Sequence, residues 1–192
     1  MADLPEPTSR SGGGIVFGGS RDSGEVDATT DLGAFARALR RRWASGVAVV
    51  TVVTPDGSLR GVTVSSLMMV SLDPPSLAIA MTREASFHEF LPVGGSLAIA
   101  ILDRAQEFTS ERFAGRAPVP DARFTGVAFD RAANGTPVLR GSLGWARCTV
   151  TTRLDEGDHV LIVGAIHEGT IPPDTDEPLI NYEAQYRGLE VR

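Results

Sequence analysis

The chain has 192 residues, of which 42% are hydrophobic and 22% charged, the size and composition of one globular domain with an additional tail. Its 18 basic and 24 acidic residues give a formal net charge of −6, which argues against sequence-independent binding to nucleic acid. All the basic residues are arginines, so chemistry that needs a catalytic lysine, such as a Schiff base, is excluded.

Cys148 is the single cysteine, which excludes an internal disulfide and a multi-cysteine metal site. No apolar run approaches the ~18 residues of a membrane span, and the N-terminus lacks the pattern of a signal peptide. His159 and His167 would lie about 26 Å apart on one strand, too far to share a metal ion. We therefore expect a cytoplasmic protein that binds no metal, no membrane and no nucleic acid.

In chain order, the first predicted element is a flexible tail over residues 1–30, which is rich in Gly, Ser and Pro. The folded domain is therefore expected at 31–192. Asp31 can cap a helix over 32–45, in which apolar residues recur at helical spacing. Pro55-Asp56-Gly57 predicts a hairpin turn. Strands are predicted at 47–53, 60–70, 77–82, 97–102, 145–153 and 159–166, and short helices at 86–91 and 104–114. This pattern predicts a mainly β protein, an antiparallel barrel with flanking helices.

The segment GVTVSS at 61–66 is the most informative for function. Thr63 and Ser65 share one face of the predicted strand. Small hydroxyl side chains and main-chain groups could hold a flat ring with polar edges. The alternative is a half-exposed strand whose hydroxyls face water.

Two further positions carry similar alternatives. Ser86 could cap the short helix that follows it, or that helix end could bind a phosphate with Arg83 nearby. His159 could act on a bound ligand, or it could be a histidine at the start of a strand that bonds to Asp158. No nucleophile motif is present, so hydrolysis by a serine or cysteine is not expected.

Five motifs in order carry a resemblance to a known family. They are GVAVVT at 46–51, GVTVSS at 61–66, VSLDPP at 70–75, ERFAG at 111–115, and GDH at 157–159 with Val163-Gly164. Together they make residues 35–188 similar to the short-chain flavin reductases, the reductase components of two-component flavin-dependent monooxygenases.

The resemblance implies a split-barrel homodimer of the flavin-reductase-like FMN-binding fold. It implies a flavin reductase that binds FMN or FAD, takes hydride from NADH or NADPH, and supplies a partner oxygenase. Carried over by position, His159 would be catalytic, close to the nicotinamide. The residues that would contact the flavin are Gly61, Thr63, Val64, Ser65, Ser66, Thr82, Ser86, Arg112, Phe113 and Tyr186.

Two other functions remain open from the residues. A split-barrel flavoprotein could retain its flavin and oxidise a substrate of its own. A flavin-binding or partner-docking module could have no enzymatic activity. The choices between FMN and FAD and between NADH and NADPH are also open.

Overall fold

The main sheet has seven strands, in the order β3-β2-β6-β9-β10-β5-β4, and each neighbouring pair is antiparallel. The computed structural model describes residues 31–117, 124–173 and 177–189; the predicted tail at 1–30 lies outside them. The strands of this sheet are β2 (Ala48–Val53), β3 (Leu59–Val64), β4 (Met68–Leu72), β5 (Pro75–Thr82), β6 (Ser96–Ile101), β9 (Gly144–Glu156) and β10 (His159–Thr170).

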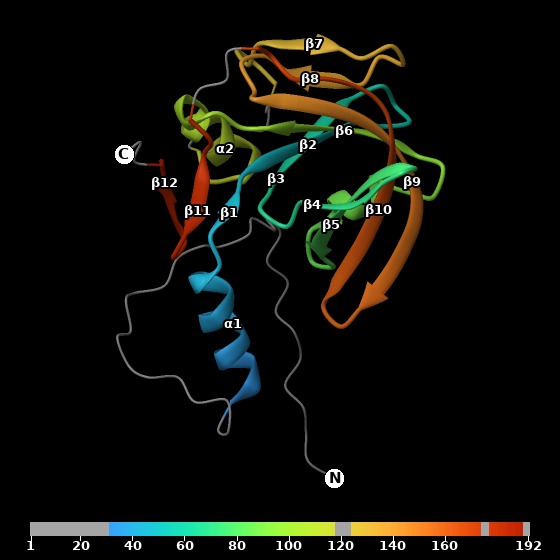
Figure 1. The fold of residues 1–192 in the computed structure, drawn as a ribbon. Helices are drawn as coiled ribbons and strands as arrows, with labels where there is room; N and C mark the ends of the chain where they lie inside the picture. Colours follow the sequence, from blue (N-terminus) through green and yellow to red (C-terminus); the bar gives the residue numbers. More distant parts are fainter. Residues whose placement is uncertain (1–30, 118–123, 174–176, 190–192) are drawn as a thin grey trace.

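The sheet closes into a barrel because its two edge strands are consecutive in the chain. Only residues 65–67 separate the end of β3 from the start of β4, and four Cα steps span at most about 14 Å. In a flat seven-stranded sheet the outer strands would lie about 29 Å apart. The sheet must therefore curl until the end of β3 meets the start of β4, as Figure 1 shows; we call this junction the seam of the barrel. The expected mainly β split barrel is confirmed.

Apolar side chains fill the barrel, and the short helices close it. The interior core takes its residues from strands on both sides of the seam and from η1 (Ser86–Phe90), which contributes Phe87. A second core lies outside the barrel, between β2 and the helix α2 (Glu107–Phe113), which follows the single turn η2 (Arg104–Gln106). This outer core fixes α2 against the barrel wall.

Two small sheets flank the barrel. One has the order β1-β11-β12, formed by β1 (Ser45–Gly46), β11 (Ile180–Tyr182) and β12 (Gln185–Arg187). The other pairs β7 (Phe129–Arg131) with β8 (Pro137–Leu139). Both were missed from the sequence, because two- and three-residue strands carry too little alternation to be recognised.

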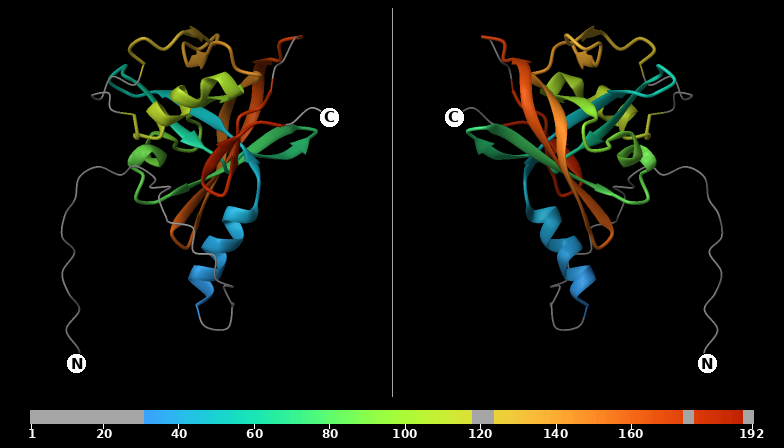
Figure 2. Two further views of the ribbon diagram at one scale, coloured as in Figure 1. Left: turned by 90° about the vertical axis from the view of Figure 1, so that its left-hand side faces the viewer. Right: turned by 90° about the vertical axis from the view of Figure 1, so that its right-hand side faces the viewer.

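The N-terminal helix α1 (Leu32–Arg42) stands away from the barrel in all three ribbon views (Figures 1 and 2). Asp31 caps it as predicted, by accepting a 2.9 Å hydrogen bond from the Ala34 N–H. None of its residues is buried. At its far end the Glu183 N–H donates to the Arg41 carbonyl at 3.0 Å, and the Glu183 carboxylate lies 3.0 Å from Arg42.

One predicted strand is wrong. The single strand expected over 60–70 is interrupted at residues 65–67, where the chain crosses the barrel seam. Ser65-Ser66-Leu67 contains no glycine or proline, so the sequence carries no strong turn signal at this point. The hairpin turn at Pro55-Asp56-Gly57, by contrast, joins β2 to β3 as expected. Within the described part of the chain, no helix has the length and apolarity needed to span a bilayer.

Candidate functional site

The barrel seam is held by the side chain of Ser66. Its hydroxyl donates to the Ala80 carbonyl at 2.7 Å and accepts from the Ala80 N–H at 3.0 Å. The ladder between β4 and β5 ends at the pair Met68 and Ala78, so Ser66 satisfies main-chain groups that the ladder leaves behind. A serine predicted to contact flavin therefore has a structural task of its own.

Thr82 and His159 lie directly opposite each other on β5 and β10. On β5, Ile79 and Met81 belong to the interior core, so by alternation Ala80 and Thr82 face outward. The outer wall beside the seam thus brings Ser66, Thr82 and His159 to one neighbourhood. The side chains along this part of β5 are small and project little from the outer face of the sheet. A flat ring can therefore approach the strand closely.

His159 is oriented by its chain neighbour. Its Nδ1 lies 2.7 Å from the Asp158 carboxylate, and this hydrogen bond is the largest cause that lowers the pKa of Asp158. A carboxylate only accepts, so Nδ1 carries the proton and Nε2 is left for another partner. The bond to Asp158, which was the alternative to a role of His159 on a ligand, is present, and it leaves Nε2 open for such a role. The ring is 32% exposed and stays accessible to a ligand.

Gly61 and Thr63 form a second group, beneath α2. A Cβ on Gly61 would lie 2.6 Å from ring carbons of Phe113, and the Thr63 hydroxyl donates to the Ser110 carbonyl at 2.7 Å. Both residues thus pack β3 against the helix. Phe113 itself is only 1% exposed and makes an edge-to-face contact with Phe124. The structure does not support the expected ligand contact by the Phe113 side chain, because that ring is in the outer core.

Two neighbours in the GVTVSS segment differ in what they can offer a ligand. The Val64 side chain is buried in the interior core, so only its main-chain groups remain for the expected contact. Ser65 is half-buried at the end of β3, between Thr63 and the seam residue Ser66. It therefore joins the two groups of predicted residues along the chain.

Tyr186 is tied to α2 by a half-buried polar network. Its hydroxyl lies 2.8 Å from the Ser110 hydroxyl and accepts from Arg116 at 2.7 Å. Arg116 also makes two hydrogen bonds, of 2.8 and 2.6 Å, to the Glu111 carboxylate. Burial raises the pKa of Tyr186, and the Arg116 bond lowers the pKa of Glu111. The C-terminal strand is thereby fastened to the helix that covers β3.

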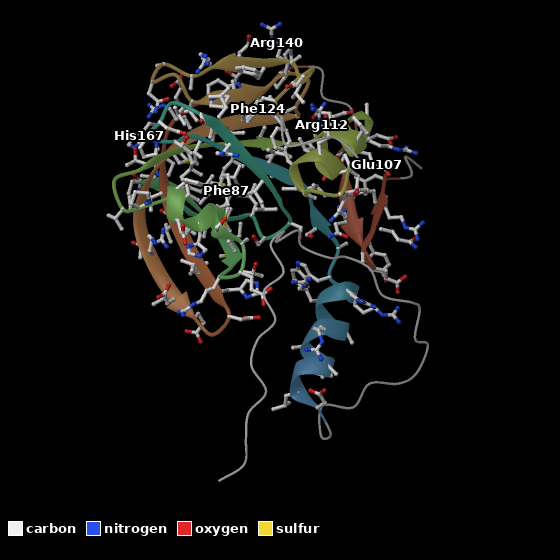
Figure 3. All side chains as sticks on the ribbon, turned by 180° about the vertical axis from the view of Figure 1, so that it is seen from behind. Phe87, Glu107, Arg112, Phe124, Arg140 and His167 are labelled. Carbon is white, nitrogen blue, oxygen red and sulfur yellow. The ribbon has the colours of Figure 1, made fainter. Side chains whose placement is uncertain are left out.

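Of the two remaining predicted residues, Arg112 is half-buried and Ser86 is exposed. Arg112, labelled in Figure 3, donates to the Thr125 carbonyl at 2.6 Å and lies 6.0 Å from the ring of Phe108. Ser86 is exposed as the first residue of η1; the capping position is Ala85, which makes no side-chain cap. The prediction of Ser86 as a cap is therefore wrong, since the turn begins one residue earlier.

The segment that carries Thr82 and Ser86 is braced at Arg83. The Arg83 N–H donates to the Asp158 carbonyl at 2.9 Å, its guanidinium lies 3.2 Å from Asp155, and its carbonyl lies 3.2 Å from Nε2 of His88. Arg153 completes the brace from β9. Neither His88 nor Arg153 belongs to a motif, and their contact depends on the fold, so sequence reasoning missed both.

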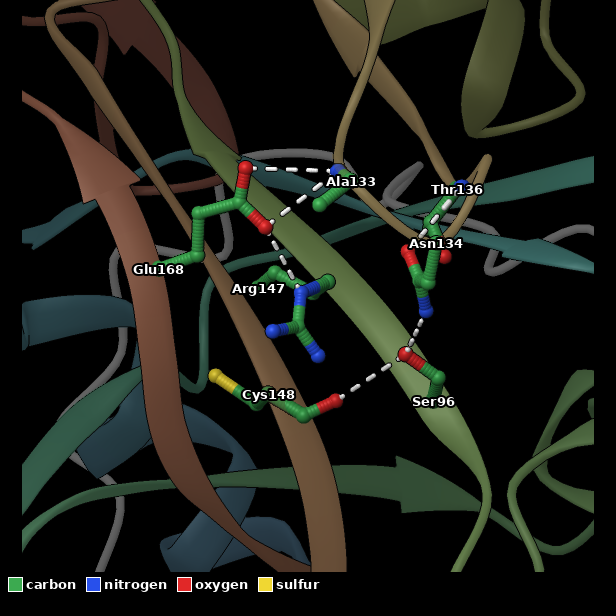
Figure 4. A network of polar contacts seen from close by, with 7 residues as sticks. All are labelled: Ser96, Ala133, Asn134, Thr136, Arg147, Cys148 and Glu168. Atoms are coloured by element: carbon green, nitrogen blue, oxygen red, sulfur yellow. Dashed lines mark hydrogen bonds and ion pairs between the residues drawn. The ribbon is translucent and has the colours of Figure 1, made fainter.

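Other polar and reactive groups lie elsewhere. Figure 4 shows a network in which Arg147 and the Ala133 N–H contact Glu168 while Asn134 bonds to Ser96, tying the β7–β8 hairpin to the barrel. Burial raises the pKa of Cys148 to about 12, so this thiol is unreactive. The described residues contain no cluster of three metal-binding side chains.

This fold and this seam are those of a known class. Residues 40–190 match the flavin reductase like domain, so the chain belongs to the flavin reductase-like family. The recognition made from the five motifs is confirmed, and the chain is an oxidoreductase of this class.

Named relatives support the same conclusion. The flavin reductase (NADH) of Kitasatospora aureofaciens is 37% identical over 144 residues, which are 74% of each chain. Among solved structures, BorF, the flavin reductase component of a bacterial two-component tryptophan halogenase, is 31% identical with a TM-score of 0.73, covering 83% of this chain and 99% of BorF. The NADH:FAD oxidoreductase SgcE6 of Streptomyces globisporus, in complex with NAD and FAD fragments, is 25% identical with a TM-score of 0.76, covering 87% and 97%.

Proposed function

We propose that this chain is an NAD(P)H:flavin oxidoreductase that reduces FMN or FAD and supplies the reduced flavin to a partner oxygenase. The observation that carries the proposal is the pairing of His159 with Thr82 beside the seam residue Ser66. It places the family's glycine–aspartate–histidine position next to two predicted flavin contacts. The relatives named as NADH-dependent reductases support a nicotinamide nucleotide as the donor.

The residues present fit a flavin. The wall beside the seam offers small side chains for a ring face, hydroxyls for a ribityl chain, and the exposed Ser86 with Arg83 nearby for a phosphate. Main-chain groups on the open edge of β3 can meet the polar edge of the ring. We assign these contacts to Thr63, Ser65, Ser66, Thr82 and Ser86, with the Val64 main chain; Gly61, Arg112 and Tyr186 support them from the α2 side.

The protein's task is positioning. Bound flavin and nicotinamide supply the hydride acceptor and donor themselves. The small side chains of β5 leave room for two rings to lie face to face. His159 can accept a hydrogen bond at Nε2 from the nicotinamide, with Asp158 holding the imidazole in place. No lysine or thiolate is needed, in agreement with the composition.

We further propose that two copies of the chain form a homodimer through β4. This strand is an edge of the main sheet, and four of its five residues are large, apolar and exposed: Met68, Met69, Val70 and Leu72. Edge strands of soluble proteins usually carry charges that prevent pairing, and β4 has none. A second copy covers such a surface most simply.

Leu72→Arg tests the dimer. Leu72 is 83% exposed, and Ile171, which is 81% exposed on another part of the surface, is a matched control. Light scattering should give a dimer mass for the wild type and for Ile171→Arg, and a monomer mass for Leu72→Arg. A wild-type mass near 20.3 kDa would contradict the proposal.

The remaining parts of the proposal concern location and partners. We propose a cytoplasmic enzyme that works on small-molecule nucleotides and binds neither nucleic acid nor membranes. The net charge of −6 supports this, since phosphate backbones and anionic lipid surfaces repel an acidic chain.

A steady-state assay that crosses both flavins with both nicotinamides tests the activity. NADH or NADPH should be consumed only when FMN or FAD is added, and flavin should separate from the protein in gel filtration. Flavin retained through the column, with turnover of another substrate, would indicate a self-contained flavoprotein instead. Flavin binding without nicotinamide oxidation would indicate a non-enzymatic module.

A further inference from the structure

Arg153 connects β9 to the short helix that follows the proposed flavin segment. One guanidinium nitrogen donates to the His88 carbonyl at 2.6 Å and to the Leu91 carbonyl at 2.7 Å. The Leu91 N–H closes η1 by donating to the His88 carbonyl at 3.2 Å, so Arg153 gives that carbonyl a second donor and also gives one to the carbonyl of Leu91, the C-cap residue. Arg153 therefore fixes the far end of the segment that starts at Thr82.

The second guanidinium nitrogen of Arg153 lies 3.3 Å from Nδ1 of His88. A guanidinium only donates, so Nδ1 must accept and therefore carries no proton. The proton of the neutral imidazole is then on Nε2, which lies 3.2 Å from the Arg83 carbonyl and donates to it. His88 thus links Arg153 to Arg83, the residue that directly follows Thr82.

We propose that Arg153 and His88 are positioning residues, which hold segment 82–86 in the conformation that presents Thr82 and Ser86 to the flavin. This inference rests on the proposed function, which assigns those two contacts. The neutral form of His88 maintains the brace. A second ring proton would place an N–H against the Arg153 guanidinium and remove the acceptor at Nδ1.

The test measures flavin and nicotinamide KM and kcat for the wild type, Arg153→Met, His88→Gln and Arg147→Met. Arg147 is the matched control, a half-buried arginine on the same strand that bonds to Glu168 far from the segment (Figure 4). Arg153→Met should raise the flavin KM about tenfold, the loss expected for hydrogen bonds from a charged group, with kcat within about twofold. Arg147→Met should leave both values unchanged.

The split between KM and kcat separates positioning from general stability. His88→Gln keeps an N–H donor for Arg83 but loses the ring Nδ1 that Arg153 meets. Its flavin KM should therefore rise while kcat stays within about twofold of the wild-type value.

The outcomes are distinguishable. A wild type that oxidises no nicotinamide with either flavin overturns the proposed function. An active wild type with an unchanged flavin KM in both Arg153→Met and His88→Gln overturns the positioning role alone. If Arg153→Met does not fold, His88→Gln and Arg153→Lys, which retains the charge but not the forked geometry, decide the question.

Discussion

Gly61 faces the ring of Phe113 so closely that an added Cβ would lie 2.6 Å from two ring carbons. The glycine thus allows α2 to pack onto β3, a reason for its presence that is independent of any ligand. Its position in the GVTVSS motif had suggested a flavin contact, and the structure adds this packing role.

Gly61→Ala should therefore destabilise the fold by about 1–3 kcal/mol, the usual cost of overpacking a core. Chemical denaturation measures the change. Phe113→Leu in the same chain should recover part of the loss, because the smaller side chain makes room for the methyl group. Equal stability of Gly61→Ala and the wild type would contradict the contact.

The seam bond of Ser66 predicts a second stability effect. Ser66→Ala removes a hydroxyl that serves both main-chain groups of Ala80, and we expect a loss of about 1–3 kcal/mol. Ser86→Ala, at an exposed hydroxyl, should change the free energy of unfolding by less than about 0.5 kcal/mol. If the two variants unfold alike, the hydroxyl of Ser66 does not hold the seam.

Tyr186→Phe tests the network between β12 and α2. The variant leaves the fully buried Ser110 hydroxyl and Arg116 without the phenol oxygen, so we expect a loss of about 1–3 kcal/mol. Because the pKa of Tyr186 is raised above 10.0, it stabilises the fold below pH 10 and loses this effect as the pH rises through the folded pKa. Thermal melts of the variant should therefore decline less at alkaline pH than those of the wild type.

The Glu111 carboxylate predicts how the stability of the fold changes at acid pH. Its pKa is lowered from 4.5 in the folded state, chiefly by Arg116, so its stabilising effect is present above pH 4.5 and is lost as the pH falls through the lowered value. Glu111→Gln should be less stable at neutral pH and should lose less stability on acidification. Glu107→Gln, an exposed position on the same helix, should follow the wild-type profile.

The burial of Cys148 predicts that a thiol reagent labels the folded and the unfolded protein at different rates. With its pKa raised to about 12 by burial, the thiol is protonated and covered at neutral pH. A thiol reagent should label the native chain only at the rate of global unfolding and should label the denatured chain at once. Rapid stoichiometric labelling of the native protein would show that β9 opens locally.

The amino-acid sequence by itself determined the strands of the barrel, the helix capped by Asp31, and the family, because these depend on local alternation, turn chemistry and motifs in order. It also showed that Asp158 and His159 are neighbours, and their hydrogen bond follows from adjacency. Only the tertiary structure decided the interruption of the strand at 65–67, the burial of Phe113 and the brace from Arg153 to His88. Each of these depends on where a curled sheet brings distant segments together. Residues 65 positions apart, such as His88 and Arg153, leave no periodic trace in the chain.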